Sequence, residues 1–289
     1  MGCSCLRQRD PAERLSEVVC CERRGTRRHN AMNGLAARRG TPEVKAGESG
    51  RETPRLTLLG GFAVYSGAEQ IFIPTSGQRL IAFLALQRRS MRRAAVAGSL
   101  WSETTDDRAC ANLRTTLWNL HRSGLGVVDA GRDHLGLSSH VLVDIDEMTA
   151  LGQRIIDFDR SKSMHPRELT RLVSRFESDL LPDWYEDWIV IERERFLQVR
   201  LHALEVICEL LLRLGRFAEA LEAGLAAVAG DPIRESAHRA VIRVHLEEGN
   251  IGETLRQYQL CQRFLADFGL EPSCQTSDLV ERHRYAARG

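Results

Sequence analysis

The fold is decided by the stretch DRACANLRTTLWNLHRS, residues 107–123, which has the period of an amphipathic helix. With about 100° of rotation per residue, one face collects Cys110, Leu113, Leu117 and Leu120. The opposite face carries Arg108, Ala111, Thr115, Trp118, Asn119 and Arg122, with Arg114 on its flank. A tryptophan among such polar side chains is unfavourable in solvent, because large apolar side chains are usually buried. The pattern therefore favours a helix that inserts this face into a groove over an ordinary solvated helix.

Two further helices are expected before this one. Ser76 is expected to cap a first helix that ends near Gln87. A basic turn follows, and a second, short helix is expected over residues 95–101. Asp106 or Asp107 is expected to cap the third helix, where acidic side chains favour the N-terminus.

Short strands are expected on both sides of these helices. The run RLTLLGGFAVY, residues 55–65, is typical of two strands around a glycine pair, and residues 71–73 predict a third strand. Residues 127–128 and 135–137 flank a Gly-Arg-Asp turn and predict a hairpin. Three strands, three helices and a terminal hairpin together predict a winged helix over residues 55–145.

The polar face of the third helix has the side chains that read base edges in a major groove. Arginine chelates guanine, Thr115 can contact a thymine methyl group, and Asn119 can grip adenine. Other arginines are placed for phosphates. Trp118 either enters the groove as well or packs on the wing. The candidate DNA-binding residues are Arg108, Arg114, Thr115, Trp118, Asn119, Arg122, Arg88, Arg89, Arg92, Arg93 and Arg132.

The charge distribution agrees with DNA contact by the front half alone. The net charge of +1 combines 11 basic against 7 acidic residues over 1–54, 9 against 5 over 55–130, and 20 against 27 over 131–289. An acidic back half repels phosphates. The only lysines, Lys45 and Lys162, lie outside any Gly-x-x-x-x-Gly-Lys-Ser/Thr motif, so no P-loop nucleoside triphosphatase is expected.

The first 54 residues mix Arg, Gly, Ser, Glu and Pro without a sustained period and are expected to be disordered. Their cysteines and His29 lack the paired spacings of a zinc site, so no metal is expected there: Cys3, Cys5, Cys20 and Cys21. The four later cysteines are expected to be buried apolar residues: Cys110, Cys208, Cys261 and Cys274. No signal peptide or membrane span is expected, which favours a cytoplasmic protein, bound at the nucleoid when on DNA.

No enzyme is expected from the motifs. The histidines form no His-Glu-x-x-His pair, and the serines form no Gly-x-Ser-x-Gly elbow. His238 and His245 lie two turns apart on one helix and are expected to be packed or solvated. Glu192 and Glu194 are interpreted as a solvated charge run. No cofactor is expected.

The back half, residues 146–285, is expected to be all-helical. Helices are predicted over 148–158, 166–181 and 184–214, followed by two helix pairs. An offset of 34 residues superimposes apolar positions and places Gly215 over Gly249, which indicates a tetratricopeptide-like repeat. The glycines are expected to end the first helix of each pair. The fold class is therefore mainly α with a small β part.

Several runs together resemble the Streptomyces antibiotic regulatory protein (SARP) family of activators, over about residues 55–280. In the front half these runs are RLTLLGGFAVY, PTSGQRLIAFLAL, VAGSLW, ANLRTTLWNLHR and VDID. In the back half they are WYEDWIVIERERF, LGRFAEALEAG and QYQLCQRFLADFGLEPS.

This resemblance implies an OmpR-type winged helix joined to a bacterial transcriptional activator domain. It also implies a homodimer on repeated promoter sites of double-stranded DNA, and contact with RNA polymerase. The chain departs from the family at Asn119 and His121, where basic residues are frequent. The departure leaves the operator open, together with the choice between activation and repression.

A second hypothesis has the same fold but no DNA binding. In it, the chain is a protein-interaction scaffold that acts through the helical domain alone. Asn119, His121 and the acidic back half motivate this alternative. The two hypotheses differ in a footprinting assay. A chain that protects no DNA but still binds RNA polymerase would favour the scaffold.

Overall fold

A computed structural model describes residues 53–159 and 164–286. All of them belong to one compact unit, residues 50–289. The expectations of a disordered N-terminus and of a cysteine cluster without metal fall outside the described residues, except that Pro54 already belongs to the first strand. The predicted boundary near residue 145 stays a prediction, because the winged helix and the helical domain lie in the same compact unit.

A four-stranded sheet opens the unit. It has the order β3-β2-β1-β7 and consists of β1 (Pro54–Thr57), β2 (Ala63–Ser66), β3 (Glu69–Ile71) and β7 (Leu142–Val143). β1 and β2 pair antiparallel across the predicted glycine pair, and β7 pairs parallel with β1. The third strand ends earlier than predicted, since Phe72 leaves the sheet and is 86% exposed while Ile73 turns into the core.

Three helices follow, as predicted: α2 (Thr75–Gln87), α3 (Arg93–Leu100) and α4 (Asp106–Arg122). The expected capping residues are wrong. Ser76 already lies inside α2, whose N-cap is Pro74, and the N-cap of α4 is Thr105; neither N-cap makes a side-chain hydrogen bond. Asp106 and Asp107 lie in the first turn of α4 instead, where their negative charge interacts favourably with the positive end of the helix dipole.

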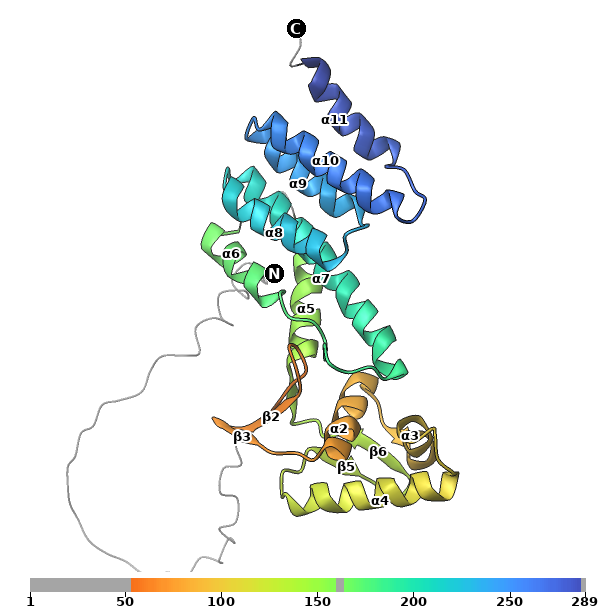
Figure 1. The fold of residues 1–289 in the computed structure, drawn as a ribbon. Helices are drawn as coiled ribbons and strands as arrows, with labels where there is room; N and C mark the ends of the chain where they lie inside the picture. Colours follow the sequence, from red (N-terminus) through yellow and green to blue (C-terminus); the bar gives the residue numbers. More distant parts are fainter. Residues whose placement is uncertain (1–52, 160–163, 287–289) are drawn as a thin grey trace, which may run out of the picture. The chain divides into compact units, whose positions relative to one another are not determined.

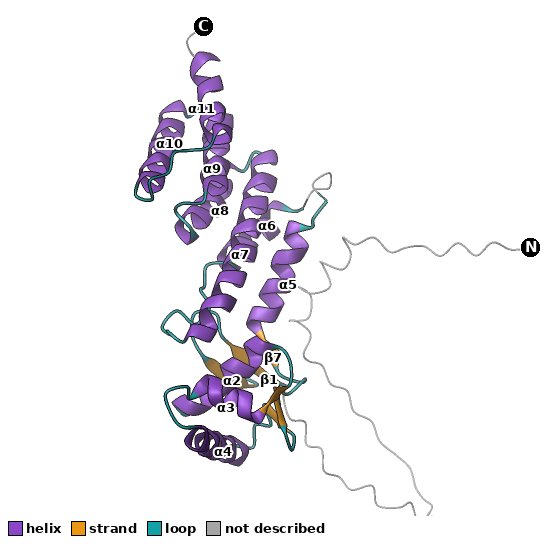
Figure 2. Ribbon diagram, turned by 90° about the vertical axis from the view of Figure 1, so that its right-hand side faces the viewer, coloured by secondary structure: helices purple, strands orange, loops and turns teal. Residues whose placement is uncertain are grey.

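A second sheet, of order β4-β6-β5, forms the wing. β5 (Val128–Ala130) and β6 (His134–Leu137) make the predicted antiparallel hairpin, and β4 (Met91–Arg92) pairs with β6. Figure 2 shows the strands confined to this part of the described chain.

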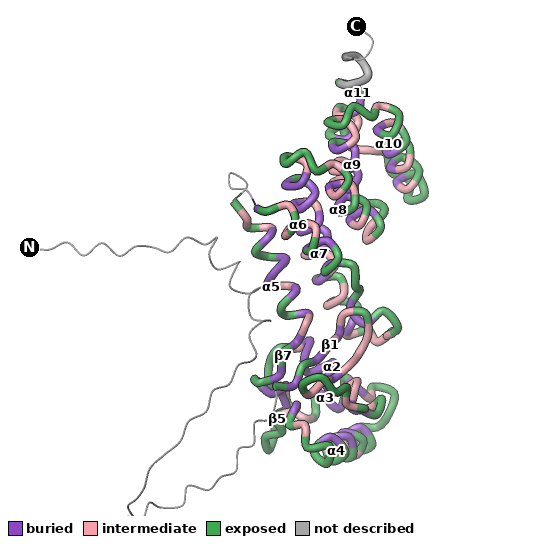
Figure 3. The backbone as a smooth tube through the Cα atoms, turned by 90° about the vertical axis from the view of Figure 1, so that its left-hand side faces the viewer, coloured by how far each residue is buried: buried purple, intermediate pink, exposed green. Residues whose placement is uncertain are grey.

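α2 forms the centre of this half and packs closely against α4. A Cβ on Gly77 would lie only 3.0 Å from Leu120 Cδ2, so the glycine permits the approach. The buried side of α4 consists of Ala109, Leu113, Thr116 and Leu120, while Cys110 and Leu117 are half-buried. The predicted apolar face is therefore correct for Leu113 and Leu120. At the other two positions the buried residue is the one before the predicted residue, Ala109 for Cys110 and Thr116 for Leu117. α4 carries both buried and exposed residues along its length (Figure 3).

The back half is all-helical, as predicted (Figure 1). Its helices are α5 (Asp144–Ile156), α6 (Pro166–Arg175), α7 (Asp187–Arg213), α8 (Phe217–Gly230), α9 (Glu235–Glu247), α10 (Ile251–Ala266) and α11 (Cys274–Ala286). α5 begins four residues earlier than predicted, and α6 ends six residues earlier, because residues 178–186 form an irregular connection instead of helix. α7 packs on α8 and α5, and α9 packs on α8 and α10.

The two glycines that are 34 residues apart both end a helix. Gly215 (φ 69°) and Gly249 (φ 81°) adopt the left-handed conformation at the ends of α7 and α9. At each end, the glycine N–H and the next N–H turn back onto the helix: Gly215 donates to Leu212 O at 2.9 Å and Gly249 to Leu246 O at 3.1 Å. This is the Schellman motif, which satisfies carbonyls that the helix leaves unpaired. The predicted glycine stops are confirmed, and the tetratricopeptide likeness stays a prediction.

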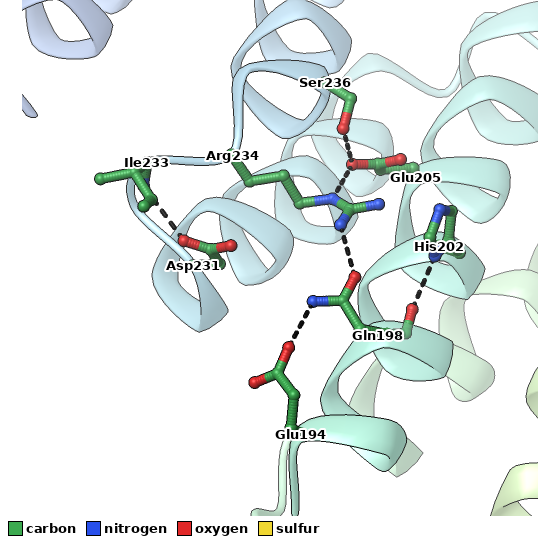
Figure 4. A network of polar contacts seen from close by, with 8 residues as sticks. All are labelled: Glu194, Gln198, His202, Glu205, Asp231, Ile233, Arg234 and Ser236. Carbon is green, nitrogen blue, oxygen red and sulfur yellow. Dashed lines mark hydrogen bonds and ion pairs between the residues drawn. The ribbon is translucent and has the colours of Figure 1, made fainter. Parts of the chain in front are cut away.

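Small residues let the repeat helices approach. A Cβ on Gly224 of α8 would lie 2.8 Å from Val241 Cγ2 on α9, so no larger residue fits there. A polar network joins α7 to the start of α9 (Figure 4). In it, Arg234 donates to Glu205 Oε1 at 2.7 Å and to Gln198 Oε1 at 2.9 Å. Gln198 in turn donates to Glu194 Oε1 at 2.7 Å.

Residues 179–186, here called the strap, lie between α6 and α7 and hold the winged helix. Leu59 and Leu180 form an antiparallel bridge, in which Gly60 N donates to Asp179 O at 2.8 Å and Leu181 N to Leu58 O at 2.9 Å. The ring of Trp184 stacks on Phe62 with centroids 6.0 Å apart. The strap thus adds backbone and aromatic contacts to the segment between β1 and β2, which is far away in the sequence.

Two arginines hold the strap, one from α7 and one from α2. Arg193 of α7 donates to three strap carbonyls, Leu180 O at 3.0 Å, Leu181 O at 2.6 Å and Trp184 O at 3.0 Å. Arg79 of α2 pairs with Glu186 at 2.8 Å and donates to Leu100 O at 3.0 Å. The strap is therefore a firm joint between the two halves of the described chain.

Candidate nucleic-acid interface

The polar face of α4 is open to solvent. Six of the predicted base-reading residues are exposed: Arg108, Arg114, Thr115, Trp118, Asn119 and Arg122. All of them come from one helix, because residues 106–122 form a single α4 of 17 residues. Among the described residues, no ion pair engages any of these arginines. Their charge is therefore available to a ligand.

Trp118 is ordered by its neighbour without being buried. It is 59% exposed, and the guanidinium carbon of Arg122 lies 4.7 Å from its ring centroid. Such a cation–π pair, one helical turn apart, keeps both side chains extended along the face. Thr115 is also fixed locally, since its hydroxyl donates to Ala111 O at 3.1 Å.

Three predicted phosphate-binding arginines gather at the wing. Arg92 pairs across the sheet with His134 and is exposed, and Arg132 is exposed in the hairpin turn. Arg93 is half-buried and donates from Nε and Nη2 to Gly131 O at 3.1 and 3.0 Å. Arg93 therefore supports the turn that presents Arg132.

Arg88 and Arg89 lie at the end of α2 beside the base of the wing, and Arg89 also lines a second cavity with Arg92 and His134 of the wing sheet. Arg88 ends α2 with a left-handed φ of 52° and pairs with Asp146 of α5 at 2.6 Å. Both arginines line a cavity of about 710 Å³ whose wall comes from α2, α5 and the base of the wing, and from no residue of α4. A phosphate contact by Arg88 would have to replace its ion pair.

Asp144 was missed as an organising residue, although it belongs to the quoted run VDID. Its carboxylate accepts from Leu58 N at 2.9 Å, Leu59 N at 3.0 Å and Ile145 N at 2.7 Å. Burial raises the pKa of this carboxyl, and the backbone donors oppose the rise. The residue thus ties the end of β1 to the start of α5.

The other titratable candidates serve packing. His238 is fully buried, with Nε2 2.9 Å from Pro232 O and Nδ1 2.9 Å from Gln257 Nε2, and burial lowers its pKa. This confirms the expectation of a packed histidine. In the described part of the chain, no three His, Cys, Asp or Glu side chains are grouped as metal ligands.

The cysteines follow the prediction only in part. Cys208 and Cys261 are buried, which raises the pKa of their thiols to about 12 and about 11. Cys110 is half-buried, and Cys274 is exposed at the start of α11, so the expectation of burial is wrong for Cys274. None of the helices that the structure describes is long and apolar enough for a membrane crossing.

Comparison with known proteins agrees with this architecture. Residues 159–283 match the family described as bacterial transcriptional activator domain. EmbR of Mycobacterium tuberculosis, solved in complex with a low-affinity phosphopeptide, is similar in fold, with a TM-score of 0.64 at 20% sequence identity. The likeness covers 80% of this chain and 65% of the EmbR chain, so this chain spans less than two thirds of that protein. No curated protein matches the sequence.

Proposed function

We propose that this chain, whose residues 159–283 match the bacterial transcriptional activator domain, is a regulator of the SARP type that binds specific sequences of double-stranded DNA. In the proposal it binds repeated promoter sites as a homodimer and activates transcription through contact with RNA polymerase. No cofactor is required.

The exposed face of α4 is the observation that carries the proposal. A solvated helix gains nothing from an exposed tryptophan. In a major groove, the same face supplies arginines for guanine, Asn119 for adenine and an aromatic ring for thymine methyl groups. The Trp118–Arg122 contact favours the conformations of both side chains along this face, which lowers the entropic cost of binding.

The wing supplies the phosphate contacts in this arrangement. Arg92 and Arg132 are exposed on the hairpin sheet, and Arg93 holds its turn. Phosphate contacts set the orientation of the recognition helix without reading sequence. Arg88 and Arg89 remain candidates for phosphates from the base of the wing.

The alternative, a scaffold without DNA binding, is favoured by one observation. Asn119 and His121 stand on α4 where related regulators often carry basic residues, which reduces attraction to phosphates. The six exposed residues of the face count against it, because a scaffold has no use for helix arginines that form no ion pair with any residue the structure describes.

Footprinting on the DNA upstream of the protein's own gene tests the proposal. We expect protection of repeated half-sites spaced by about 10–10.5 base pairs or a multiple of that distance. Affinity should fall steeply with salt, because phosphate contacts release counterions. Arg114→Ala and Arg122→Ala should each weaken specific binding by about 1–3 kcal/mol.

Arg171→Ala on α6 is the matched control, since it removes an equal charge from an exposed position in the helical half. It should leave the footprint unchanged. Absent binding, or binding that does not respond to salt, contradicts the proposal and favours the scaffold.

A further inference from the structure

The start of α7 presents three large apolar side chains to solvent. Tyr185 is 87% exposed, Val190 55% and Ile191 60%. Val190 and Ile191 lie on one side of α7, and Tyr185 precedes the N-cap Glu186. The residue before an N-cap is close to the fourth residue of the helix, here Val190. These three exposed side chains at the start of α7 are here called the apolar patch.

The patch is surrounded by negative charge. Residues 181–195 contain five acidic and two basic residues. Arg193 is used by the strap carbonyls, and Arg195 pairs with Glu192 at 2.5 Å. Among the described residues, no ion pair engages Asp183, Asp187 or Glu194; Glu194 accepts only from the neutral Gln198 (Figure 4). Three of the five acids, Asp183, Asp187 and Glu194, therefore keep a charge that no basic side chain of the described residues pairs with, whereas Glu186 and Glu192 are paired.

The backbone that carries the patch is held rigidly. Trp184 and Glu186, on either side of Tyr185, are fixed by the stack on Phe62 and by the ion pair with Arg79. The side chains of Trp184 and Glu186 contact other parts of the protein, whereas that of Tyr185 is exposed to solvent. An exposed aromatic side chain on a backbone that is already held is suited to a binding hot spot, because less backbone entropy is lost on contact.

We infer that the apolar patch docks a second protein that presents basic side chains around an apolar centre. Its negative surroundings repel DNA and anionic membranes. A two-fold pairing of two copies through this patch would place the same acids against each other, which disfavours self-association. A basic protein surface satisfies both the apolar side chains and the acids. The inference rests on the proposed function, in which RNA polymerase is the protein to be engaged.

Exposed apolar residues also occur at Phe268 and Leu270, with exposures of 66% and 53%. These close the end of α10, where Gly269 N donates to Ala266 O and Leu270 N to Leu265 O. This turn is a Schellman motif, which commonly carries an apolar residue at the position of Leu270. It accounts for that residue without a partner and provides a matched control.

The test uses the full chain and purified RNA polymerase holoenzyme. Binding is measured twice, as a supershift on the footprinted DNA and by biolayer interferometry without DNA. Tyr185→Ala with Ile191→Ala should weaken polymerase binding about tenfold or more, the loss typical of central apolar contacts. Asp183→Asn with Glu194→Gln should weaken it less and reduce its dependence on salt. Phe268→Ala with Leu270→Ala should leave it unchanged.

Circular dichroism and binding to DNA should be the same for all three double variants. Unchanged polymerase binding by both patch variants overturns the inference. Weaker self-association in analytical ultracentrifugation, with unchanged polymerase binding, overturns it in favour of a dimer contact. If the wild-type chain binds polymerase through the patch and binds no DNA, the inference stands while the proposed function fails.

Discussion

Trp118 on α4 keeps 59% of its surface in solvent and contacts one arginine of its own helix. Trp188 on α7 packs edge-on against Phe83, with centroids 5.2 Å apart, and against Trp184 at 6.3 Å. The arginines near the two tryptophans differ in the same way. Arg193 donates to strap carbonyls, whereas Arg114 is exposed and forms no ion pair within the described part of the chain. Tryptophan and arginine therefore have different roles in the two regions. At the start of α7 they stabilise the connection between the two halves, and on α4 they stay exposed, where a ligand can contact them.

The largest effect should come from exchanging the two tryptophans for alanine. Trp188→Ala removes an aromatic packed against the core residue Phe83 and should cost about 3 kcal/mol of unfolding free energy. Trp118→Ala should change it by less than about 0.5 kcal/mol, because the side chain is exposed. Urea denaturation measures both values. Equal losses would show that Trp118 also has a structural role and would remove the contrast.

A smaller effect is expected from Arg193→Met. The substitution keeps the length of the side chain and leaves three strap carbonyls without their charged donor, which should cost about 2 kcal/mol. Arg195→Met is the matched control, since Arg195 is 70% exposed and its ion pair with Glu192 lies at the surface. Unfolding in urea should distinguish the pair. A stable Arg193→Met variant would show that the strap does not need this arginine.

The smallest effect is expected from the buried His238, as a change in how the stability of the fold depends on pH. In the unfolded chain its imidazole takes up a proton near the ordinary pKa of 6.5, whereas burial lowers the pKa in the folded protein. Acidification below pH 6.5 therefore protonates the unfolded chain first and reduces stability, and the loss is complete below the folded-state pKa. His238→Gln should flatten this part of the stability profile, measured as the melting temperature from neutral pH downward. A profile as steep as that of the wild type would assign the acid sensitivity to other groups.

The sequence was sufficient for the elements whose signals are local. The period of residues 107–123 predicted α4, and the hairpin and the glycine stops at 215 and 249 followed from turn chemistry. The helix caps were wrong at Ser76 because several residue types can precede a helix and the tertiary path chooses among them. Local patterns therefore located the elements better than their ends.

The strap could not be predicted, because its contacts join residues far apart in the sequence. Leu180 and Leu181 fitted the period of a longer α6, yet Leu181 adopts a φ of 44° and pairs with Leu58. The partners of Trp184 and Trp188 are Phe62 and Phe83, over a hundred residues earlier in the chain. For the candidate interface, helical spacing alone predicted the exposed face of α4. It could not show that Arg88 pairs with Asp146, because α5 meets the end of α2 only in the folded chain.

The central claim, that the exposed face of α4 reads base edges, is tested most directly by a double-mutant cycle between Arg114 and the base pair it contacts. Guanines within each footprinted half-site are substituted one at a time, and the affinity of wild type and Arg114→Ala for each DNA is measured at one salt concentration. At one position the substitution should cost the wild type about 1–3 kcal/mol and cost Arg114→Ala almost nothing. If every base change, tested against Arg114→Ala and then Arg122→Ala, costs the variant as much as it costs the wild type, α4 does not read the sequence.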